Sequence, residues 1–274
     1  MPASKRYSIM MVAGEVSGDT HAAGVIEQLK TQNPGLKIFG MGGPQMAKAG
    51  MEVREDLTKQ ALIGFGEVLK HYPWIKKRFD QCVRWLEQEK PDLLFLVDYP
   101  GFNLRLARKA KTLGIPVCYY VAPQVWAWHK SRITLIRQVV QKLLVILPFE
   151  EGFFLKEKVP AVYVGNPLTE EMEFKKISRV KAMKKHGIGG EKFPLVCVMP
   201  GSRKGEVKKI WPLCVETSRL LRRKYPDAGF IVPRPASLTP DDYPGCGPED
   251  PFFFVEAPAY DLRNVCDLAW VKSG

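Results

Sequence analysis

The chain has 274 residues, of which 46% are hydrophobic and 26% are charged. These fractions are typical of a folded globular protein and exclude a disordered, collagen-like or low-complexity chain. The 41 Lys and Arg residues outnumber the 29 Asp and Glu residues, so the net charge is +12. Such a surplus predicts an anionic partner: a nucleic acid, an acidic membrane surface or a phosphorylated substrate.

Over the first 166 residues, short β-rich runs alternate with helical stretches. The predicted strands cover residues 7–13, 36–41, 92–98, 115–121, 143–147 and 161–164. The predicted helices cover residues 20–31, 103–113 and 131–140. The run at 92–98 is apolar up to its last residue, as in a parallel strand that is covered on both faces. This βαβ alternation predicts the α/β class with a doubly wound parallel sheet.

The sequence Gly165-Asn166-Pro167 interrupts this rhythm. A polar helical stretch is expected at 168–186, and a second series of elements follows it. Its predicted strands cover 194–199, 229–233, 252–256 and 268–272, and its predicted helices cover 207–225 and 260–265. We therefore expect two Rossmann-like domains, residues 1–166 and residues 167–274, of which the second is incomplete.

The six cysteines form no C-x-x-C pair, which argues against a zinc ribbon or a thioredoxin-like motif. A reducing compartment fits them best. No apolar run approaches the roughly 18 residues that a membrane span needs. The sequence therefore predicts a cytosolic protein, or one that attaches to a membrane from the cytosolic side.

In open α/β sheets, ligands bind at the carboxyl ends of the strands, so the loops there are the candidate sites. The first is Gly14-Glu15-Val16-Ser17-Gly18-Asp19. Its glycines permit a tight turn, and free N–H groups at the helix start favour an anion. It matches neither a dinucleotide fingerprint nor a P-loop. An ordinary turn in which Asp19 caps the helix is an equally good interpretation.

The second candidate is Asp98, at the end of a buried strand. A carboxylate held there, partly shielded from water, can have a raised pKa and act as a general base. Asn103 would then hydrogen-bond a substrate hydroxyl. The alternative is that Asp98 caps the turn and that Asn103 caps the next helix.

The third candidate is the segment from Ala122 to His129, which contains Gln124, Trp126 and Trp128. Tryptophans beside polar and cationic groups suit stacking on a sugar ring, although both rings could instead be core aromatics. His129 alone has no partner at metal-ligand spacing, so no metal site is expected.

The fourth candidate is Pro200-Gly201-Ser202-Arg203, which opens a helix of the second domain. Backbone N–H groups, a hydroxyl and an Arg meet there, as a diphosphate requires. The alternative is a solvated basic turn. No D-x-D motif follows any strand, so a metal-bridged nucleotide sugar is not indicated.

Several motifs occur together in a characteristic order: GEVSGD, FGMGGPQMAKAG, LIGFGEVL, VDYPGFN, YVAPQVWAW, LPFE, VGNPL and PGSRKGEV. With them the chain, from about residue 7 to its end, resembles the lipid-A-disaccharide synthase family. The resemblance implies a GT-B fold and an inverting glycosyltransferase that needs neither metal nor cofactor. It also implies transfer of 2,3-diacylglucosamine from UDP-2,3-diacylglucosamine to 2,3-diacylglucosamine 1-phosphate (lipid X), which gives lipid A disaccharide 1-phosphate and UDP.

The candidate residues receive roles in this reaction, and the resemblance implies a place in the cell. Asp98 is expected to be the general base, with Glu15 as its rival, and Gly201, Ser202 and Arg203 are expected to bind the donor phosphates. The residues expected on the acceptor side are Ser17, Asn103, Gln124, Trp126 and His129. The enzyme is expected at the cytoplasmic face of the bacterial inner membrane. Formation of a homodimer by the complete protein is left open.

The segment 62–75 is expected to dock on an anionic membrane surface through Leu62, Phe65, Leu69 and Trp74. Pro73 is expected to divide it into two short helices. A stripe further along the chain is instead expected to pack on the core, namely Ile75, Phe79, Cys82 and Leu86.

Three other functions are considered beside that of an active synthase: an inactive fragment, a UDP-sugar epimerase and a nucleic-acid-binding module. Family members continue beyond position 274 into groups that hold UDP, so the sequence is expected to be a truncated form. Such a fragment could be inactive and retain only acceptor or membrane binding. A UDP-sugar epimerase of similar shape would need further acids and a His at its cleft. A nucleic-acid-binding module would need a basic stripe, whereas the Lys and Arg residues here are scattered over helices, so no nucleic acid is expected.

Overall fold

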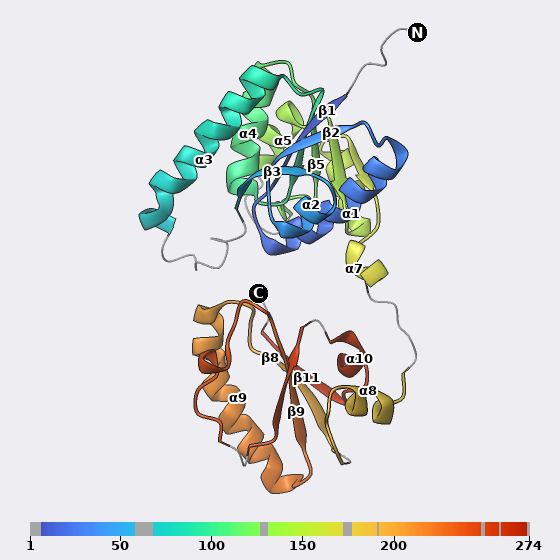
Figure 1. Cartoon of the computed structure of the whole chain (residues 1–274), viewed down its shortest axis with the longest axis vertical. Helices are drawn as coiled ribbons and strands as arrows, with labels where there is room; N and C mark the ends of the chain where they lie inside the picture. The colour runs from blue at the N-terminus through green and yellow to red at the C-terminus, as the bar shows by residue number, and fades with distance from the viewer. Residues whose placement is uncertain are drawn as a thin grey trace. The chain divides into compact units, whose positions relative to one another are not determined.

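A computed structural model describes residues 7–57, 68–126, 131–171, 177–190, 192–247, 250–257 and 259–272. Within them the chain forms two compact units that divide between Glu170 and Glu171. The sequence placed this boundary between residues 166 and 167. Figure 1 shows the sheet and helices that make up each unit.

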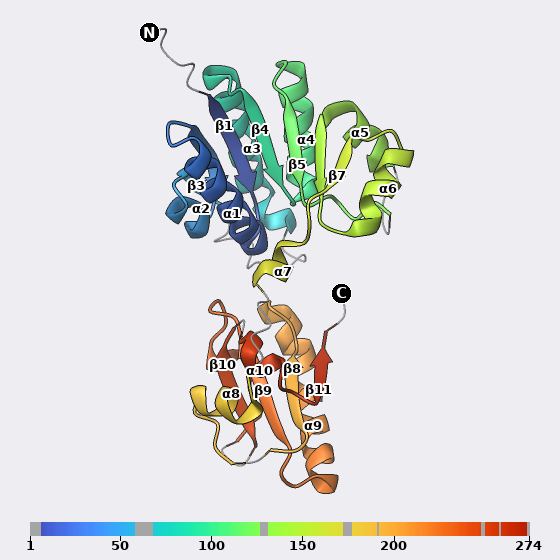
Figure 2. The same cartoon turned by 90° about the vertical axis from the view of Figure 1, so that its right-hand side faces the viewer.

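The described part of the first unit is built on a seven-stranded sheet in which every pair of neighbours is parallel. Its strands are β1 (Ser8–Ala13), β2 (Lys37–Gly42), β3 (Glu52–Asp56), β4 (Leu93–Val97), β5 (Val117–Tyr120), β6 (Lys142–Val145) and β7 (Ala161–Tyr163). Their spatial order is β3-β2-β1-β4-β5-β6-β7. The direction of winding therefore reverses between β1 and β4, and Figure 2 shows these strands side by side.

Helices cover both faces of this sheet because its central strands are apolar on both sides. These helices are α1 (Val16–Gln32), α2 (Pro44–Lys48), α3 (Val68–Glu89), α4 (Pro100–Thr112), α5 (Arg132–Val139) and α6 (Pro148–Lys156). The short helix α7 (Pro167–Glu171) contains the boundary between the two units. On β1, Met10 and Val12 belong to the core under α3, α4 and α5. Met11 and Ala13 point the opposite way and belong to the core under α1 and α2.

The described second unit is smaller and contains a four-stranded parallel sheet in the order β10-β9-β8-β11. The strands are β8 (Leu195–Met199), β9 (Gly229–Arg234), β10 (Phe252–Glu256) and β11 (Leu268–Val271). The helices are α8 (Arg179–Lys185), α9 (Lys204–Lys224) and α10 (Tyr260–Arg263), with a short 3-10 turn at Pro240–Asp242. The predicted α/β class, with two parallel sheets, is confirmed.

The prediction that Pro73 divides a helix in two is wrong. Helix α3 continues through Pro73 to Glu89. A proline removes one backbone hydrogen bond and strains one turn, but the residues after it are held by packing. As predicted, Cys82 and Leu86 are buried in the core, and Ile75 and Phe79 pack against it.

The single helix predicted at 168–186 is also wrong. Helix α7 ends at Glu171, and residues 177 and 178 are not helical. Each helix has a side-chain cap of its own: the Leu168 N–H donates to Asn166 Oδ1 at 3.1 Å, and the Lys181 N–H donates to Ser178 Oγ at 3.4 Å. Such caps mark helix starts.

Within the described residues, no helix combines the length and the apolar character that crossing a bilayer requires.

Candidate active site

Two carboxylates lie at the point where the first sheet reverses its winding. Ala13 of β1 pairs with Val97 of β4, so the residues that follow these strands emerge next to each other. Glu15 follows β1 and Asp98 follows β4. This is the place where doubly wound sheets bind their ligands.

The Asp98 carboxylate has an environment suited to a general base. Partial burial raises its pKa, and the negative charge of Glu15 raises it further. The backbone N–H of Tyr99 acts in the opposite direction and does not cancel these effects. A carboxylate whose pKa is raised toward neutrality holds a proton more strongly and is still ionised above that pKa.

The turn that carries Asp98 is strained. Asp98 and Tyr99 both have left-handed backbone conformations, with φ values of 47° and 50°. The Tyr99 ring lies over Gly14, where a Cβ would stand only 2.3 Å from Tyr99 Cδ1. The ring also stacks on Phe102, with centroids 5.7 Å apart. Gly14 is therefore needed for close approach to this turn.

Asn103 lies behind the same turn. It is fully buried, and its Nδ2 donates to the carbonyl oxygens of Val97 at 3.1 Å and Asp98 at 2.7 Å. The amide nitrogen is thus engaged with the backbone, whereas Oδ1 has no hydrogen-bond partner among the described residues, so the contact with a substrate hydroxyl expected from the sequence stays a prediction. Asn103 is therefore tied to the turn that carries Asp98.

The carboxylate of Asp19 has a role that the sequence did not suggest. The prediction that it caps its own helix is wrong, because α1 starts after Glu15 and contains Asp19. The Asp19 side chain is buried and accepts backbone hydrogen bonds from Gly43, Gln45 and Met46 at 2.9, 3.0 and 3.0 Å. It therefore caps α2 and ties it to α1. Ser17 is exposed on the first turn of α1.

The loop after β5 brings one predicted acceptor residue into a defined contact. Trp126 Nε1 donates to Glu150 Oε1 at 3.1 Å, and the Trp126 and Phe149 rings form a T-shaped pair with centroids 5.1 Å apart. Gln124 is exposed. Glu150 is buried and was not anticipated, because it lies on α6, which the sequence analysis missed. His129 and Trp128 lie outside the described residues.

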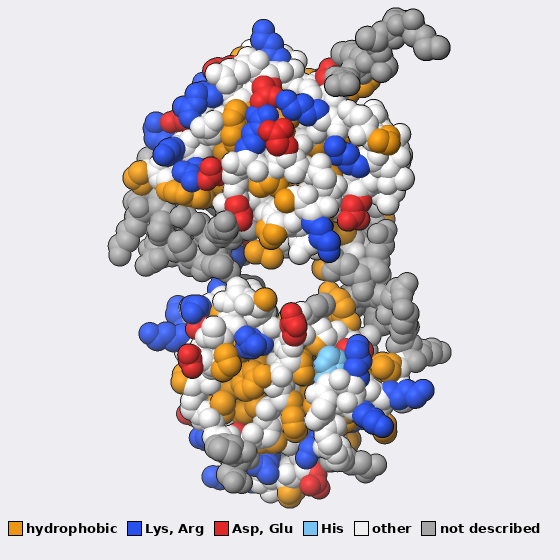
Figure 3. Space-filling model, viewed as in Figure 1, with side chains coloured by type: hydrophobic (Ala, Val, Ile, Leu, Met, Phe, Trp, Pro, Cys, Tyr) orange, Lys and Arg blue, Asp and Glu red, His pale blue; other side chains and the backbone are white. Residues whose placement is uncertain are grey.

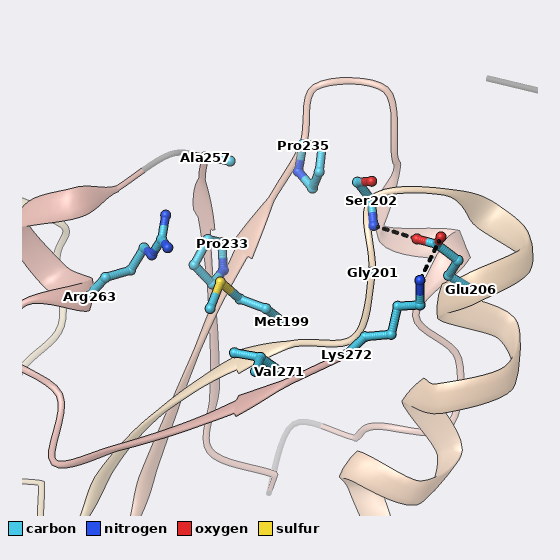
Figure 4. A pocket seen from close by; sticks show the side chains of 10 residues that line it. All are labelled: Met199, Gly201, Ser202, Glu206, Pro233, Pro235, Ala257, Arg263, Val271 and Lys272. Carbon is cyan, nitrogen blue, oxygen red and sulfur yellow. Dashed lines mark hydrogen bonds and ion pairs between the residues drawn. The ribbon is translucent and has the colours of Figure 1, made fainter. Parts of the chain in front are cut away.

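The second unit has an open pocket of about 450 Å³ at the carboxyl ends of its strands. Figure 4 shows Gly201 and Ser202 on one wall, with Lys272 beside them and Arg263 opposite. Arg203 is not among the lining residues and lies at the start of α9. Lys272 follows β11, the neighbour of β8, so the winding of this sheet also reverses at the pocket.

Glu206 occupies the backbone N–H groups that the sequence assigned to a phosphate. Its Oε2 accepts hydrogen bonds from the N–H groups of Ser202 at 3.0 Å and Arg203 at 3.3 Å. Its Oε1 pairs with Lys272 Nζ at 3.2 Å. Burial raises the pKa of Glu206, but Lys272 and the two N–H groups outweigh it, and the pKa is lowered. The Glu206 carboxylate therefore fixes this loop by binding its backbone N–H groups. A ligand would then contact the side chains of the loop.

Arg263 and Lys272 were missed from the sequence. A signal for Lys272 was present, because it is the last residue of the predicted strand at 268–272, just as Asp98 is the last residue of the predicted strand at 92–98. Arg263 lies on the short helix α10, and nothing in its local sequence indicates that folding brings it to the pocket. Among the described residues, no group of three or more His, Cys, Asp or Glu residues is arranged to hold a metal ion.

Residues 9–274 match the profile of a family described as lipid-A-disaccharide synthetase. The chain belongs to this family. It is 37% identical over 278 residues to the lipid-A-disaccharide synthase of Trichlorobacter lovleyi, covering the whole chain and 72% of the relative. It is 39% identical to that of Nitrosococcus oceani, covering 97% of the chain and 69% of the relative.

Solved structures share the fold at much lower identity. A UDP-GlcNAc 2-epimerase from Neisseria meningitidis bound to UDP-GlcNAc superposes with a TM-score of 0.63 at 15% identity, over 98% of this chain and 77% of that one. The Methanocaldococcus jannaschii UDP-GlcNAc 2-epimerase in complex with UDP-GlcNAc and UDP gives 0.62 at 13% identity, over 98% and 79%. These matches support the GT-B type of fold and carry no information about activity.

Proposed function

We propose that this chain is a glycosyltransferase that moves 2,3-diacylglucosamine from UDP-2,3-diacylglucosamine to 2,3-diacylglucosamine 1-phosphate. The products are lipid A disaccharide 1-phosphate and UDP. The observation that carries the proposal is the half-buried Asp98 carboxylate, with its raised pKa, at the reversal point of the first sheet in a member of this family.

Asp98 acts as the general base. Its carboxylate takes the proton of the acceptor's primary hydroxyl while that oxygen attacks the anomeric carbon of the donor. The bond between this carbon and the UDP oxygen breaks, and UDP leaves with the electron pair. A hydroxyl is a weak nucleophile, so a positioned base typically accelerates such a step by about 10²–10⁴-fold.

The donor diphosphate binds in the pocket of the second unit. Arg263 and Lys272 line this pocket together with Gly201 and Ser202, and Arg203 lies next to it at the start of α9. Cations placed near the departing diphosphate stabilise the charge that develops as the bond breaks. On the first unit, the acceptor contacts Ser17, Gln124, Trp126 and His129.

The proposed function is tested by the products of the reaction. With both substrates, we expect mass spectrometry to find the tetraacyl disaccharide 1-phosphate, in an amount equal to the UDP released. Without the acceptor, no UDP should be released. Conversion of a UDP-sugar to its 2-epimer without an acceptor would instead establish the epimerase alternative.

A nucleic-acid-binding function has little support on the surface. On the face drawn in Figure 3, Lys and Arg side chains are scattered among acidic and apolar ones in both units. A nucleic acid requires the basic side chains to gather in a patch or stripe. The net positive charge fits two phosphorylated, membrane-borne substrates better.

Replacing Arg263 by Ala is expected to weaken the binding of UDP at least about tenfold. A hydrogen bond to a charged group contributes about 1.5–3 kcal/mol, and 1.4 kcal/mol corresponds to a factor of ten. Isothermal titration calorimetry with UDP measures the effect. Arg223→Ala, which removes an exposed Arg of α9, is the matched control and should leave Kd unchanged. Equal Kd values for both variants would remove Arg263 from the donor site.

Attachment to the cytoplasmic face of the inner membrane is part of the proposal. The segment that would insert begins with Leu62 and Phe65, which lie outside the described residues, as does the side chain of Leu69. Trp74 packs against the core, and Arg78 Cζ lies 4.6 Å from the centroid of its ring. Replacing Trp74 would therefore affect folding as well as any contact with lipid. Trp74 is therefore left unchanged in a test of membrane binding.

The double variant Leu62→Ser, Phe65→Ser is expected to reduce flotation with anionic vesicles by at least about tenfold. Each apolar side chain buried in lipid contributes about 1.5–3 kcal/mol. Leu113→Ser, at an exposed Leu on the first unit, is the matched control. If the folded double variant floats as well as this control, the segment does not dock on the membrane.

A further inference from the structure

The carbonyl oxygen of Asp98 accepts hydrogen bonds from two buried side chains. The Tyr119 hydroxyl donates to it from β5, the strand beside β4. Asn103 Nδ2 donates to it from α4 at 2.7 Å. The Asp98 N–H in turn donates to the Tyr120 carbonyl at 3.0 Å. Both peptide groups that flank the Asp98 Cα are therefore fixed.

These bonds hold a backbone conformation that does not form easily by itself. Two successive residues other than glycine, Asp98 and Tyr99, have positive φ values. Each such conformation is unfavourable for a residue with a side chain and persists only where the surroundings determine it. Fixing both flanking peptides also fixes the direction of the Asp98 Cα–Cβ bond, and with it the place of the carboxylate.

The Tyr119 hydroxyl has no packing role of its own. The residue is fully buried among apolar side chains, where a Phe would fill the same space. A hydroxyl in such a place must find a partner, and its partner is the turn that carries the proposed base. The charged group that acts on Asp98 is Glu15, and those that act on Tyr119 are Asp98 and Arg132.

We propose that Tyr119 and Asn103 are positioning residues, which hold the Asp98 turn in its strained conformation so that the carboxylate meets the acceptor hydroxyl. This inference deepens the proposed function and rests on it. It predicts that loss of the Tyr119 hydroxyl acts on the reaction only through Asp98.

Tyr119→Phe is expected to lower kcat about tenfold, while KM for both substrates stays within about twofold. Because a looser turn admits more water to the carboxylate, the acidic limb of the pH profile of kcat/KM should move to lower pH. In an Asp98→Asn background, Tyr119→Phe should change kcat by less than about twofold. Tyr243→Phe, which removes a buried hydroxyl in the second unit, is the matched control and should change none of these quantities.

A second variant covers the case in which Tyr119→Phe does not fold. Asn103→Ser weakens the other donor to the same carbonyl and should give the same fall in kcat and the same shift in pH profile. An equal loss of kcat in the native and Asp98→Asn backgrounds, or an unmoved pH profile, would overturn the inference and leave Tyr119 a structural residue. If Asp98→Asn alone keeps near-normal kcat, the assignment of the base fails instead, so the two failures are distinguishable.

Discussion

Replacing Asp98 by Asn is expected to lower kcat by about a hundredfold or more, while binding of the acceptor is nearly unchanged. Asn has the shape of Asp and keeps the turn, but its amide cannot take a proton from the attacking hydroxyl. A positioned base contributes about 10²–10⁴-fold to such a step. Initial rates of UDP release at saturating donor and acceptor measure this effect.

Asp56→Asn is the matched control for this variant. Asp56 is a partly buried acid at the end of β3, on the edge of the same sheet, but away from the reversal point between β1 and β4. We expect its kcat to remain within about twofold of the native value. If Asp98→Asn behaves like this control, Asp98 is not the base.

Asp19→Ala is expected to reduce the free energy of unfolding of the first unit by about 3 kcal/mol or more. Three backbone N–H groups lose their acceptor, and each buried donor left without a partner costs about 1–3 kcal/mol. Urea denaturation, followed by tryptophan fluorescence, measures the change.

The control for this stability prediction is Asp241→Ala, at an exposed acid of the second unit, which should change stability by less than about 0.5 kcal/mol. A midpoint for Asp19→Ala equal to that of the control would show that water replaces the carboxylate at no cost. The hydrogen bonds from the start of α2 to Asp19 on α1 would then add nothing to stability.

The central strands and the place of the site follow from local patterns in the sequence. The uninterrupted apolar run ending at Asp98 predicts both a buried parallel strand and a ligand-facing carboxylate, and β4 ends at Val97. Strand β10 has the predicted bounds, Phe252–Glu256. Such features depend on residues that are neighbours along the chain, so that periodicity alone reveals them.

The features that sequence analysis missed depend on contacts between distant parts of the chain. The backbone N–H groups that donate to Asp19 are not in its own helix but lie more than 20 residues away along the chain. Glu206 looks like an ordinary first-turn acid, and only the fold shows that Lys272 meets it. Helix α3 continues through Pro73 because packing of its later turns outweighs a local rule.

The measurement that tests the account most directly is the pH dependence of kcat/KM in the native enzyme and in Glu15→Gln. The native profile should fall on the acidic side as Asp98 takes up a proton, with an apparent pKa above the ordinary range of an Asp. Because the charge of Glu15 raises the pKa of Asp98, its removal should move this limb to lower pH. Activity at pH 8 should fall less than tenfold. Loss of activity at every pH in Glu15→Gln, with near-normal kcat in Asp98→Asn, would contradict the account and make Glu15 the base.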